Sequence, residues 1–305
     1  MRTTLCIATL LLVLATLAPP AAATAAPYVY AALGDSVASG HGVNTSATDA
    51  CRRSAAAYPD LVYATLANSD FHDLACSGAT TTQMLDTQVE HAGRMLGDDR
   101  GLVTITVGAN DFEFANGLTY VRAFIPRLYG SFVRFRDRAA ERVRTNLATA
   151  LERLGAGKPQ RTIMVTTYFD PFNAKSVLYE TADQLNAQCD QTRRERPPCH
   201  QVMAETVQAL NEAILGAVTD YAGTVADANV IAVDEVAAAF DEHRAPKPYC
   251  GTADHPPFEE SWIQARQDGR LNIFNPPRNG DDCFHPNARG QEELAVMVLR
   301  AMPGS

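Results

Sequence analysis

Five short, β-prone segments recur along this chain, and helix-like stretches separate them. Each segment is continuously apolar rather than alternating, which is typical of strands buried on both faces of a sheet. Strands that alternate with helices favour a parallel sheet covered on both sides, because every parallel connection needs a crossover. The predicted strands cover residues 28–33, 71–75, 102–107, 162–167 and 230–233.

The stretches between these segments show helical periodicity, most clearly over residues 132–154. There, apolar residues recur at spacings of three or four, as on the buried face of a helix. The arginines from Arg134 to Arg144 are interspersed with acidic residues, so we interpret them as a solvated helix face rather than a basic binding patch. The predicted helices cover residues 55–66, 80–94, 132–154, 202–221 and 286–302.

The first 26 residues have the pattern of a secretory signal peptide. Arg2 is the only charged residue before Tyr28, an apolar stretch follows at residues 10–14, and residues 21–26 are small. A membrane anchor is the alternative interpretation, but the apolar stretch is short for one, and no later segment approaches the length of a membrane span. We therefore expect a secreted, extracellular protein with no stable membrane span, a signal peptide at residues 1–26 and one domain at residues 27–305.

The cysteines agree with export. Cys6 belongs to the expected signal peptide, and an even number of cysteines in an exported chain favours disulfides over free thiols. A metal site is less consistent with the sequence, because no CxxC or HxxxH spacing occurs. Six cysteines allow fifteen pairings, of which we expect the sequential one: Cys51–Cys76, Cys189–Cys199 and Cys250–Cys283.

Residue types suited to catalysis follow several predicted strands. Ligands of open α/β sheets bind outside the carboxyl ends of the strands, so these segments would share one site. The segments are Gly34-Asp35-Ser36, Cys76-Ser77-Gly78, Gly108-Ala109-Asn110-Asp111 and Tyr168-Phe169-Asp170-Pro171, with Asp282-Cys283-Phe284-His285-Pro286 before the last helix.

These types match the needs of acyl transfer. The Ser36 hydroxyl is a weak nucleophile until a base such as His285 takes its proton, and Asp282 would orient that imidazole. The oxyanion needs fixed donors, which the N–H groups of Ser36 and Gly78 and the Asn110 amide would supply. Each residue also has a structural interpretation: Ser36 and Asn110 as caps or turn residues, Gly78 as a strand end, and Asp282 and His285 as a surface acid and a helix-start residue.

The same segments, in this order, resemble the four motif blocks of the SGNH (GDSL) hydrolase superfamily, and most closely those of its secreted actinobacterial lipases and esterases. The resemblance implies a flavodoxin-like three-layer α/β/α fold with a five-stranded parallel sheet. It also implies ester hydrolysis without a metal or other cofactor. Ser36 would then be the nucleophile, His285 the base oriented by Asp282, and Ser36, Gly78 and Asn110 the oxyanion hole.

The sequence departs from the superfamily pattern at two positions. After the serine, where a hydrophobic or aromatic residue is usual, this sequence has the small Val37, which is a mild change. Ala109 replaces the second glycine of a Gly-Gly-Asn-Asp block. A methyl group at position 109 would narrow the site or shift its loop. Some related lipases use a backbone carbonyl in place of the acid that Asp282 would supply here.

The substrate is less constrained than the chemistry. The net charge of −9 disfavours nucleic acid as a partner. Apolar residues after Asn110 would line an acyl pocket or, alternatively, form ordinary core. We expect a monomer that cleaves lipid esters (acyl glycerides or phospholipids); a carbohydrate acetylesterase and a non-enzymatic carbohydrate- or surface-binding protein remain alternatives. The pocket candidates are Phe112, Phe114, Leu118, Tyr120, Val121, Phe124, Ile125, Leu128 and Tyr129, and more weakly Phe172, Trp262, Ile273 and Phe274.

Overall fold

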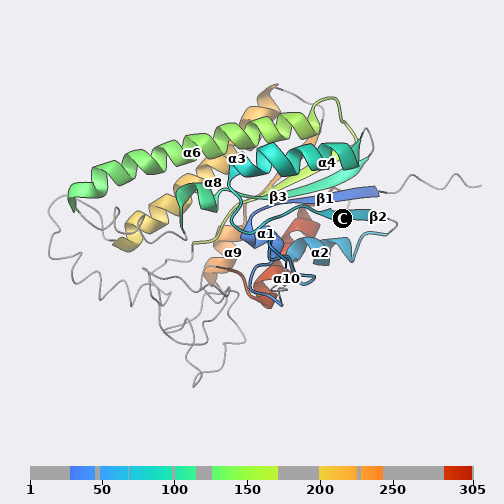
Figure 1. Ribbon diagram of the computed structural model, residues 1–305, viewed down its shortest axis with the longest axis horizontal. Helices are drawn as coiled ribbons and strands as arrows, with labels where there is room; N and C mark the ends of the chain where they lie inside the picture. The colour runs from blue at the N-terminus through green and yellow to red at the C-terminus, as the bar shows by residue number, and fades with distance from the viewer. Residues whose placement is uncertain are drawn as a thin grey trace, which may run out of the picture.

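The structure is a computed structural model that describes residues 28–44, 49–67, 69–97, 100–114, 126–170, 199–224, 228–242 and 285–303 (Figure 1). The expected signal peptide, residues 1–26, lies outside these ranges, and the single domain at residues 27–305 stays a prediction. Within the described ranges, no helix combines the length and the hydropathy that crossing a membrane requires.

Five parallel strands form the centre of the protein, as predicted. Their order is β2-β1-β3-β4-β5, which is the order of flavodoxin-like doubly wound sheets. The register sets Tyr30 of β1 beside Phe71 of β2 and Leu102 of β3. The expected α/β fold is therefore confirmed. The strands are β1 (Tyr28–Gly34), β2 (Ser69–Asp73), β3 (Gly101–Thr106), β4 (Arg161–Thr166) and β5 (Asn229–Val233).

The prediction that every strand is buried on both faces is wrong for β2 and β5. All of β3 and nearly all of β1 are buried, but the residues of β2 are at most half-buried, and only Val233 of β5 is fully buried. These two strands lie at the edges of the sheet, where helices cover them incompletely. The polar residues of β2 are tolerated there for that reason.

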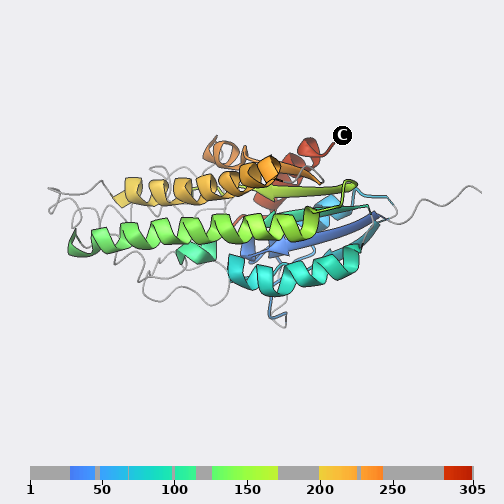
Figure 2. The ribbon, with the colours of Figure 1, turned by 90° about the horizontal axis from the view of Figure 1, so that it is seen from above.

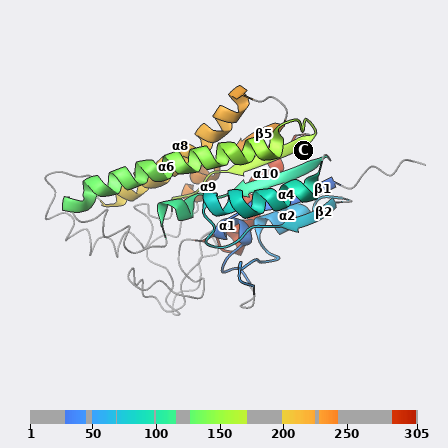
Figure 3. The same ribbon diagram turned by 45° about the horizontal axis from the view of Figure 1, so that its top comes forward.

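Helices cover both faces of the sheet, which gives the three expected layers (Figures 1 and 2). The short α3, the π-helical turn η1 and α4 form one continuous helical segment beside α6, and α8 runs along the other side of α6 (Figures 2 and 3). The 3-10 turn η2 (Ala109–Phe112) follows β3. One face carries α3 (Thr81–Gln83), η1 (Met84–Gln88), α4 (Val89–Leu96), α6 (Pro126–Gly155) and α8 (Cys199–Thr224), and the other carries α1 (Ser36–Ser39), α2 (Tyr58–Tyr63), α9 (Val236–Glu242) and α10 (Ala288–Ala301).

The predicted helices are present, with changed ends, and two short ones were not predicted. The apolar stripe of α6 is buried at Phe132, Val143 and Leu151, and its arginines are mostly exposed, as expected of a solvated face. The helices α1 and α9 are too short for a periodic pattern to indicate them. Their positions depend on the strands that precede them.

Candidate active site

Ser36 lies where β1 turns directly into α1. The turn requires glycine at position 34, because Gly34 has a φ of +142° and an added Cβ would come within 2.0 Å of the Thr106 carbonyl oxygen. The Asp35 N–H donates to that same carbonyl at 2.9 Å. The turn is therefore pressed against β3, and the partly exposed Ser36 has a fixed position at the carboxyl end of the sheet.

Asp35 supports this turn from the interior. Its buried carboxylate accepts hydrogen bonds from the Val37 N–H at 3.0 Å and from the Tyr168 hydroxyl at 2.5 Å. Burial raises the pKa of Asp35 to about 6, and the Tyr168 hydrogen bond is the largest influence that opposes this rise. The backbone of Ala109 lies close enough to the Tyr168 hydroxyl to offset part of the rise that burial causes in the pKa of this phenol. The phenol, two residues after β4, thus lies against both the serine turn and the loop after β3.

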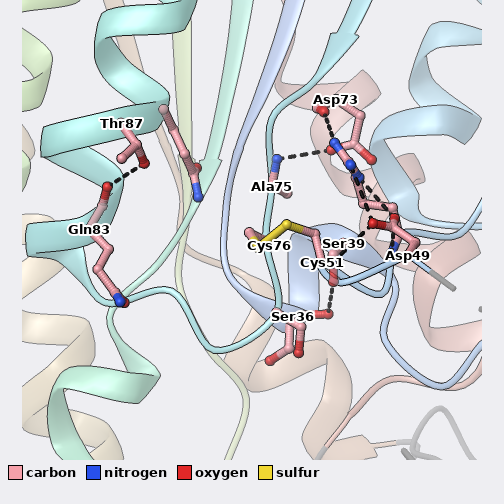
Figure 4. Close-up of a disulfide and its surroundings, with 12 residues drawn as sticks. Ser36, Ser39, Asp49, Cys51, Asp73, Ala75, Cys76, Gln83 and Thr87 are labelled. Atoms are coloured by element: carbon pink, nitrogen blue, oxygen red, sulfur yellow. Dashed lines mark hydrogen bonds and ion pairs between the residues drawn. A yellow bond between two sulfur atoms is a disulfide. The ribbon is translucent and has the colours of Figure 1, made fainter. Parts of the chain in front are cut away.

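The second predicted segment, which carries Gly78, lies beside the serine turn. The Cys76 N–H donates to the Gly34 carbonyl at 3.0 Å, and a disulfide joins Cys76 to Cys51, the first of the three expected pairs (Figure 4). Gly78 is exposed and has a φ of +87°, and apart from its chain neighbours no atom of the described residues lies within 4 Å of the position that a Cβ would take. Glycine is therefore needed here for its backbone conformation.

Asn110 is bonded to the segment that carries Gly78. Its side-chain Nδ2 donates to the Ala79 carbonyl at 3.0 Å, and a primary amide keeps a second N–H for another acceptor. The neighbouring Asp111 is buried, where it accepts hydrogen bonds from the Thr81 N–H and hydroxyl, both at 2.8 Å, and from Arg142 at 3.1 Å. The loop that carries Asn110 is thereby fixed to α3 and α6.

The backbone at Ala109 is one that a residue with a side chain can adopt. Before Asn110 the positive φ falls on Gly108, at +132°, and Ala109 begins the 3-10 turn with a negative φ. Gly108 is the position where a side chain would collide, because a Cβ there would lie 2.7 Å from Leu210 Cδ1. The substitution of the second glycine by alanine is thus compatible with this backbone.

His285 lies just before α10 and next to the serine turn. Its ring stacks on that of His41, with centroids 4.8 Å apart and planes 9° apart, and the His41 N–H donates to the Ser36 carbonyl at 3.0 Å. The buried side chain of Gln291 anchors α10 here, since it donates to the Val37 carbonyl at 3.1 Å and accepts from the Tyr58 N–H at 2.8 Å. The last helix is therefore attached to the first.

The segments that carry four of the predicted residues, Ser36, Gly78, Asn110 and His285, thus contact one another near the carboxyl ends of the strands. Among the described residues, no hydrogen bond joins the Ser36 hydroxyl to His285, so proton transfer between them stays a prediction. Asp282 lies outside the described residues, and its contact with His285 stays a prediction too.

The sequence did not point to four of the supporting residues. Asp35 and Tyr168 stood in segments already singled out at strand ends, and that position was the only signal for them. His41 and Gln291 carried no signal in the sequence, because their roles depend on the contact between α1 and α10.

Four of the candidate acyl-pocket residues, Phe112, Phe114, Leu128 and Tyr129, lie within the described ranges. Phe112 is fully buried in the main hydrophobic core, which favours the core interpretation for that residue, and Phe114 packs beside it with ring centroids 5.8 Å apart. Tyr129 packs against Phe132 in a separate small cluster between α6 and α8. Leu128 is half-buried. Outside the described residues lie Leu118, Tyr120, Val121, Phe124, Ile125, Phe172, Trp262, Ile273 and Phe274.

The other two expected disulfides each include a cysteine outside the described residues. Cys189, Cys250 and Cys283 lie outside the described residues, so the pairs Cys189–Cys199 and Cys250–Cys283 stay predictions. Across the described ranges, no group of three or more His, Cys, Asp and Glu side chains is arranged to hold a metal ion.

Comparison with known proteins extends these observations. The sequence matches the model of the GDSL-like Lipase/Acylhydrolase family over residues 32–293. A lipase of Streptomyces rimosus is 40% identical over 104 residues, and lipase 1 of Streptomyces coelicolor is 42% identical over 101 residues. Each alignment spans 32% of this chain, and the alignments span 37% and 36% of these relatives, respectively.

Two solved structures have a similar fold. Phospholipase A1 from Streptomyces albidoflavus NA297 superposes with a TM-score of 0.62 at 24% identity, over 91% of this chain and 100% of that one. The extracellular lipase of Streptomyces rimosus superposes with a TM-score of 0.59 at 20% identity, over 90% and 100%. At these identities the likeness concerns the fold.

Proposed function

The chain belongs to the GDSL-like lipase/acylhydrolase family, and from that premise we propose that it is a serine ester hydrolase with Ser36 as its nucleophile. The observation that most supports the proposal is the meeting of three separate segments around Ser36. The Cys76 N–H binds the Gly34 carbonyl, the Asn110 amide binds the Ala79 carbonyl, and His285 stacks beside the turn. These contacts support a site in which the Ser36 alcohol, the His285 imidazole and the N–H donors act on one substrate.

In the acylation step, His285 takes the proton of the Ser36 hydroxyl while the oxygen attacks the ester carbonyl carbon. The carbonyl oxygen becomes an oxyanion, which the N–H groups of Ser36 and Gly78 and the free N–H of Asn110 bind. The ester C–O bond then breaks, and His285 returns the proton to the departing alcohol. The products of this step are the free alcohol and an acyl-Ser36 ester.

Deacylation repeats these roles with water. His285 takes a proton from a water molecule, whose oxygen attacks the acyl-Ser36 carbonyl, and the same donors hold the second oxyanion. Collapse of this intermediate releases the carboxylic acid and returns the proton to Ser36. The net reaction consumes one ester and one water and needs no cofactor.

Two carboxylates would stabilise the protonated imidazole. Asp282, three residues before His285, would hold its orientation, as in other serine hydrolases. Asp35 is close enough for the charge of His285 to lower its pKa, so by reciprocity an ionised Asp35 favours imidazolium. Both Asp35 oxygens are already bound, by Val37 and Tyr168. Its influence is therefore electrostatic, which leaves the orienting contact to Asp282.

For the substrate, we propose carboxylic esters of lipids, acyl glycerides or phospholipids. The similar proteins are a lipase, lipase 1 and a phospholipase A1, and these names guide the substrate class without separating its members. We also propose that the protein is exported and takes part in extracellular lipid degradation. The basic, apolar and small-residue pattern of residues 1–26 supports export, and one structural neighbour is described as extracellular.

The test combines covalent labelling with substrates of graded length. A fluorophosphonate should label the folded, oxidised protein at Ser36, and the Ser36→Ala variant should not be labelled. p-Nitrophenyl esters from acetate to long-chain acids should be hydrolysed, with substantial rates beyond acetate. Activity limited to acetate would favour a carbohydrate acetylesterase, and the absence of both labelling and turnover would favour a binding protein.

A further inference from the structure

His41 contacts the proposed catalytic centre at three points, although acyl transfer as described above assigns it no role. Its backbone N–H donates to the Ser36 carbonyl at 3.0 Å, its ring stacks on His285 with centroids 4.8 Å apart, and its Nδ1 lies 2.6 Å from the Ser77 hydroxyl. A single half-buried side chain therefore joins the base to the segment that precedes Gly78.

The stack bears on the orientation of His285. Parallel aromatic rings at 4.8 Å lie within the range of favourable stacked contacts, so the face of His41 opposes tilting of the His285 ring. During acylation His285 becomes a cation, and the face of a neutral aromatic ring attracts a cation. His41 is therefore suited to hold the ring plane of His285 both before and after proton transfer.

The hydrogen bond to Ser77 bears on the oxyanion hole. Ser77 is held on two sides, because its N–H donates to the Cys51 carbonyl at 3.0 Å and its hydroxyl is bonded to His41. Its neighbour Gly78 has a φ of +87° and, as a glycine, no side chain that could hold its backbone in place. The restraint on the Gly78 N–H therefore comes from the residues on either side.

We propose that His41 is a positioning residue, which orients His285 through its ring face and Gly78 through Ser77. This inference rests on the proposed ester hydrolase function and adds a residue to its machinery. The two contacts can be separated experimentally, because phenylalanine retains a flat ring but has no nitrogen, and Ser77→Ala removes the same hydrogen bond from the other side.

The experiment compares His41→Ala, His41→Phe, Ser77→Ala and the double variant His41→Phe/Ser77→Ala. His91→Ala, on the exposed side of α4, is the matched control. Initial rates with the best p-nitrophenyl ester give kcat and KM. Ring ¹H–¹³C NMR spectra, with His285 assigned from a His285→Gln variant, report the ring-current shift of the His285 Cε1–H without requiring turnover.

We expect His41→Ala to lower kcat about 100-fold with little change in KM, the cost of misplaced catalytic groups. His41→Phe and Ser77→Ala should each lower kcat about tenfold, the effect of one hydrogen bond, and the double variant should be no slower than either. The ring-current shift of His285 should persist in His41→Phe and disappear in His41→Ala.

Three results would overturn the proposal: a His41→Ala enzyme no slower than His41→Phe, an equal loss in His91→Ala, or a His285 shift that His41→Ala leaves unchanged. Failure of the proposed function has a different signature, since wild-type protein would then show neither fluorophosphonate labelling nor turnover. An active wild type with an unaffected His41→Ala variant contradicts the role of His41 alone.

Discussion

The Tyr168 hydroxyl donates a hydrogen bond to the buried carboxylate of Asp35, across a separation of 133 residues in the chain. The backbone of Tyr168 is itself fixed, because its N–H and carbonyl are both bonded to the Asn211 side chain of α8 at 2.8 Å. The end of β4 and helix α8 thereby support the turn that carries Ser36. Support of this kind pre-organises a nucleophile on rigid elements.

Tyr168→Phe should destabilise the protein, and more so at high pH. The change leaves the buried Asp35 carboxylate without this donor, at a cost of about 1–3 kcal/mol. Asp35 has a pKa of about 6 in the folded protein against 3.8 ordinarily, so its burial reduces stability as pH rises through this window. Losing the hydrogen bond raises that pKa further and deepens the reduction.

Urea unfolding at pH 5 and pH 8 measures this effect. Tyr63→Phe, which alters a tyrosine that is 37% exposed, is the control and should match wild type at both values. A loss in Tyr168→Phe that is identical at pH 5 and pH 8 would contradict the proposed coupling to Asp35.

Asn110→Ala should lower kcat about 10²–10³-fold, as expected when one oxyanion donor is removed. Because the Asn110 side chain also bonds the Ala79 carbonyl, circular dichroism and thermal unfolding should accompany the kinetics. Ser36→Ala should abolish turnover altogether. Nearly full activity in either folded variant would remove that residue from the proposed mechanism.

Asp73→Asn should stabilise the protein at neutral and alkaline pH. Burial raises the pKa of Asp73 to about 7, and nearby Asp60 contributes to the rise. A carboxyl whose pKa is higher in the folded than in the unfolded protein destabilises the fold when it is ionised. For Asp73 this destabilisation is absent below pH 3.8, grows as the pH rises and is complete above pH 7. The full shift corresponds to about 4 kcal/mol. Because solvent screens this partly exposed carboxyl, removing its charge should add about 2 kcal/mol at pH 8.

The control for this change is Asp70→Asn, on the same strand, where the side chain is 65% exposed. Thermal or urea unfolding between pH 4 and pH 8 should show a flatter stability profile for Asp73→Asn, whereas Asp70→Asn should follow wild type. If the stability of Asp73→Asn changed with pH in parallel with that of wild type, the pH dependence would come from other groups than Asp73.

Replacing Cys51 and Cys76 together by alanine should destabilise the protein by about 3 kcal/mol, given a sequence separation of 25 residues. The bridge joins the loop before α2 to the segment before Gly78, so turnover should also fall. Calorimetry of the variant, and of wild type with and without reductant, provides the measurement. A melting temperature that neither the substitution nor the reductant lowers would show that this bridge does not contribute to stability.

Local pattern was sufficient to predict the layers of this protein. Continuous apolar segments and helical periodicity recur with the spacing of a parallel α/β sheet, and five strands lie within a few residues of the predicted ranges. The same rule about strand ends indicated Ser36, Gly78 and Asn110, because residues that follow parallel strands converge at one edge of the sheet. His285, which precedes the last helix, was indicated by the order of motifs that resembles the SGNH superfamily. These predictions needed only the order of residues along the chain.

Packing between distant segments decided the rest. Which strands would be edges, why the turn at Gly34 excludes a Cβ, and which side chains support the site all depend on elements brought together by the fold. The contact of His41 with His285 and that of Tyr168 with Asp35 join residues far apart in sequence, and no periodicity relates them. Periodicity in the sequence indicates which side of one helix or strand is buried. The geometry of a catalytic site depends instead on how several such elements pack against one another.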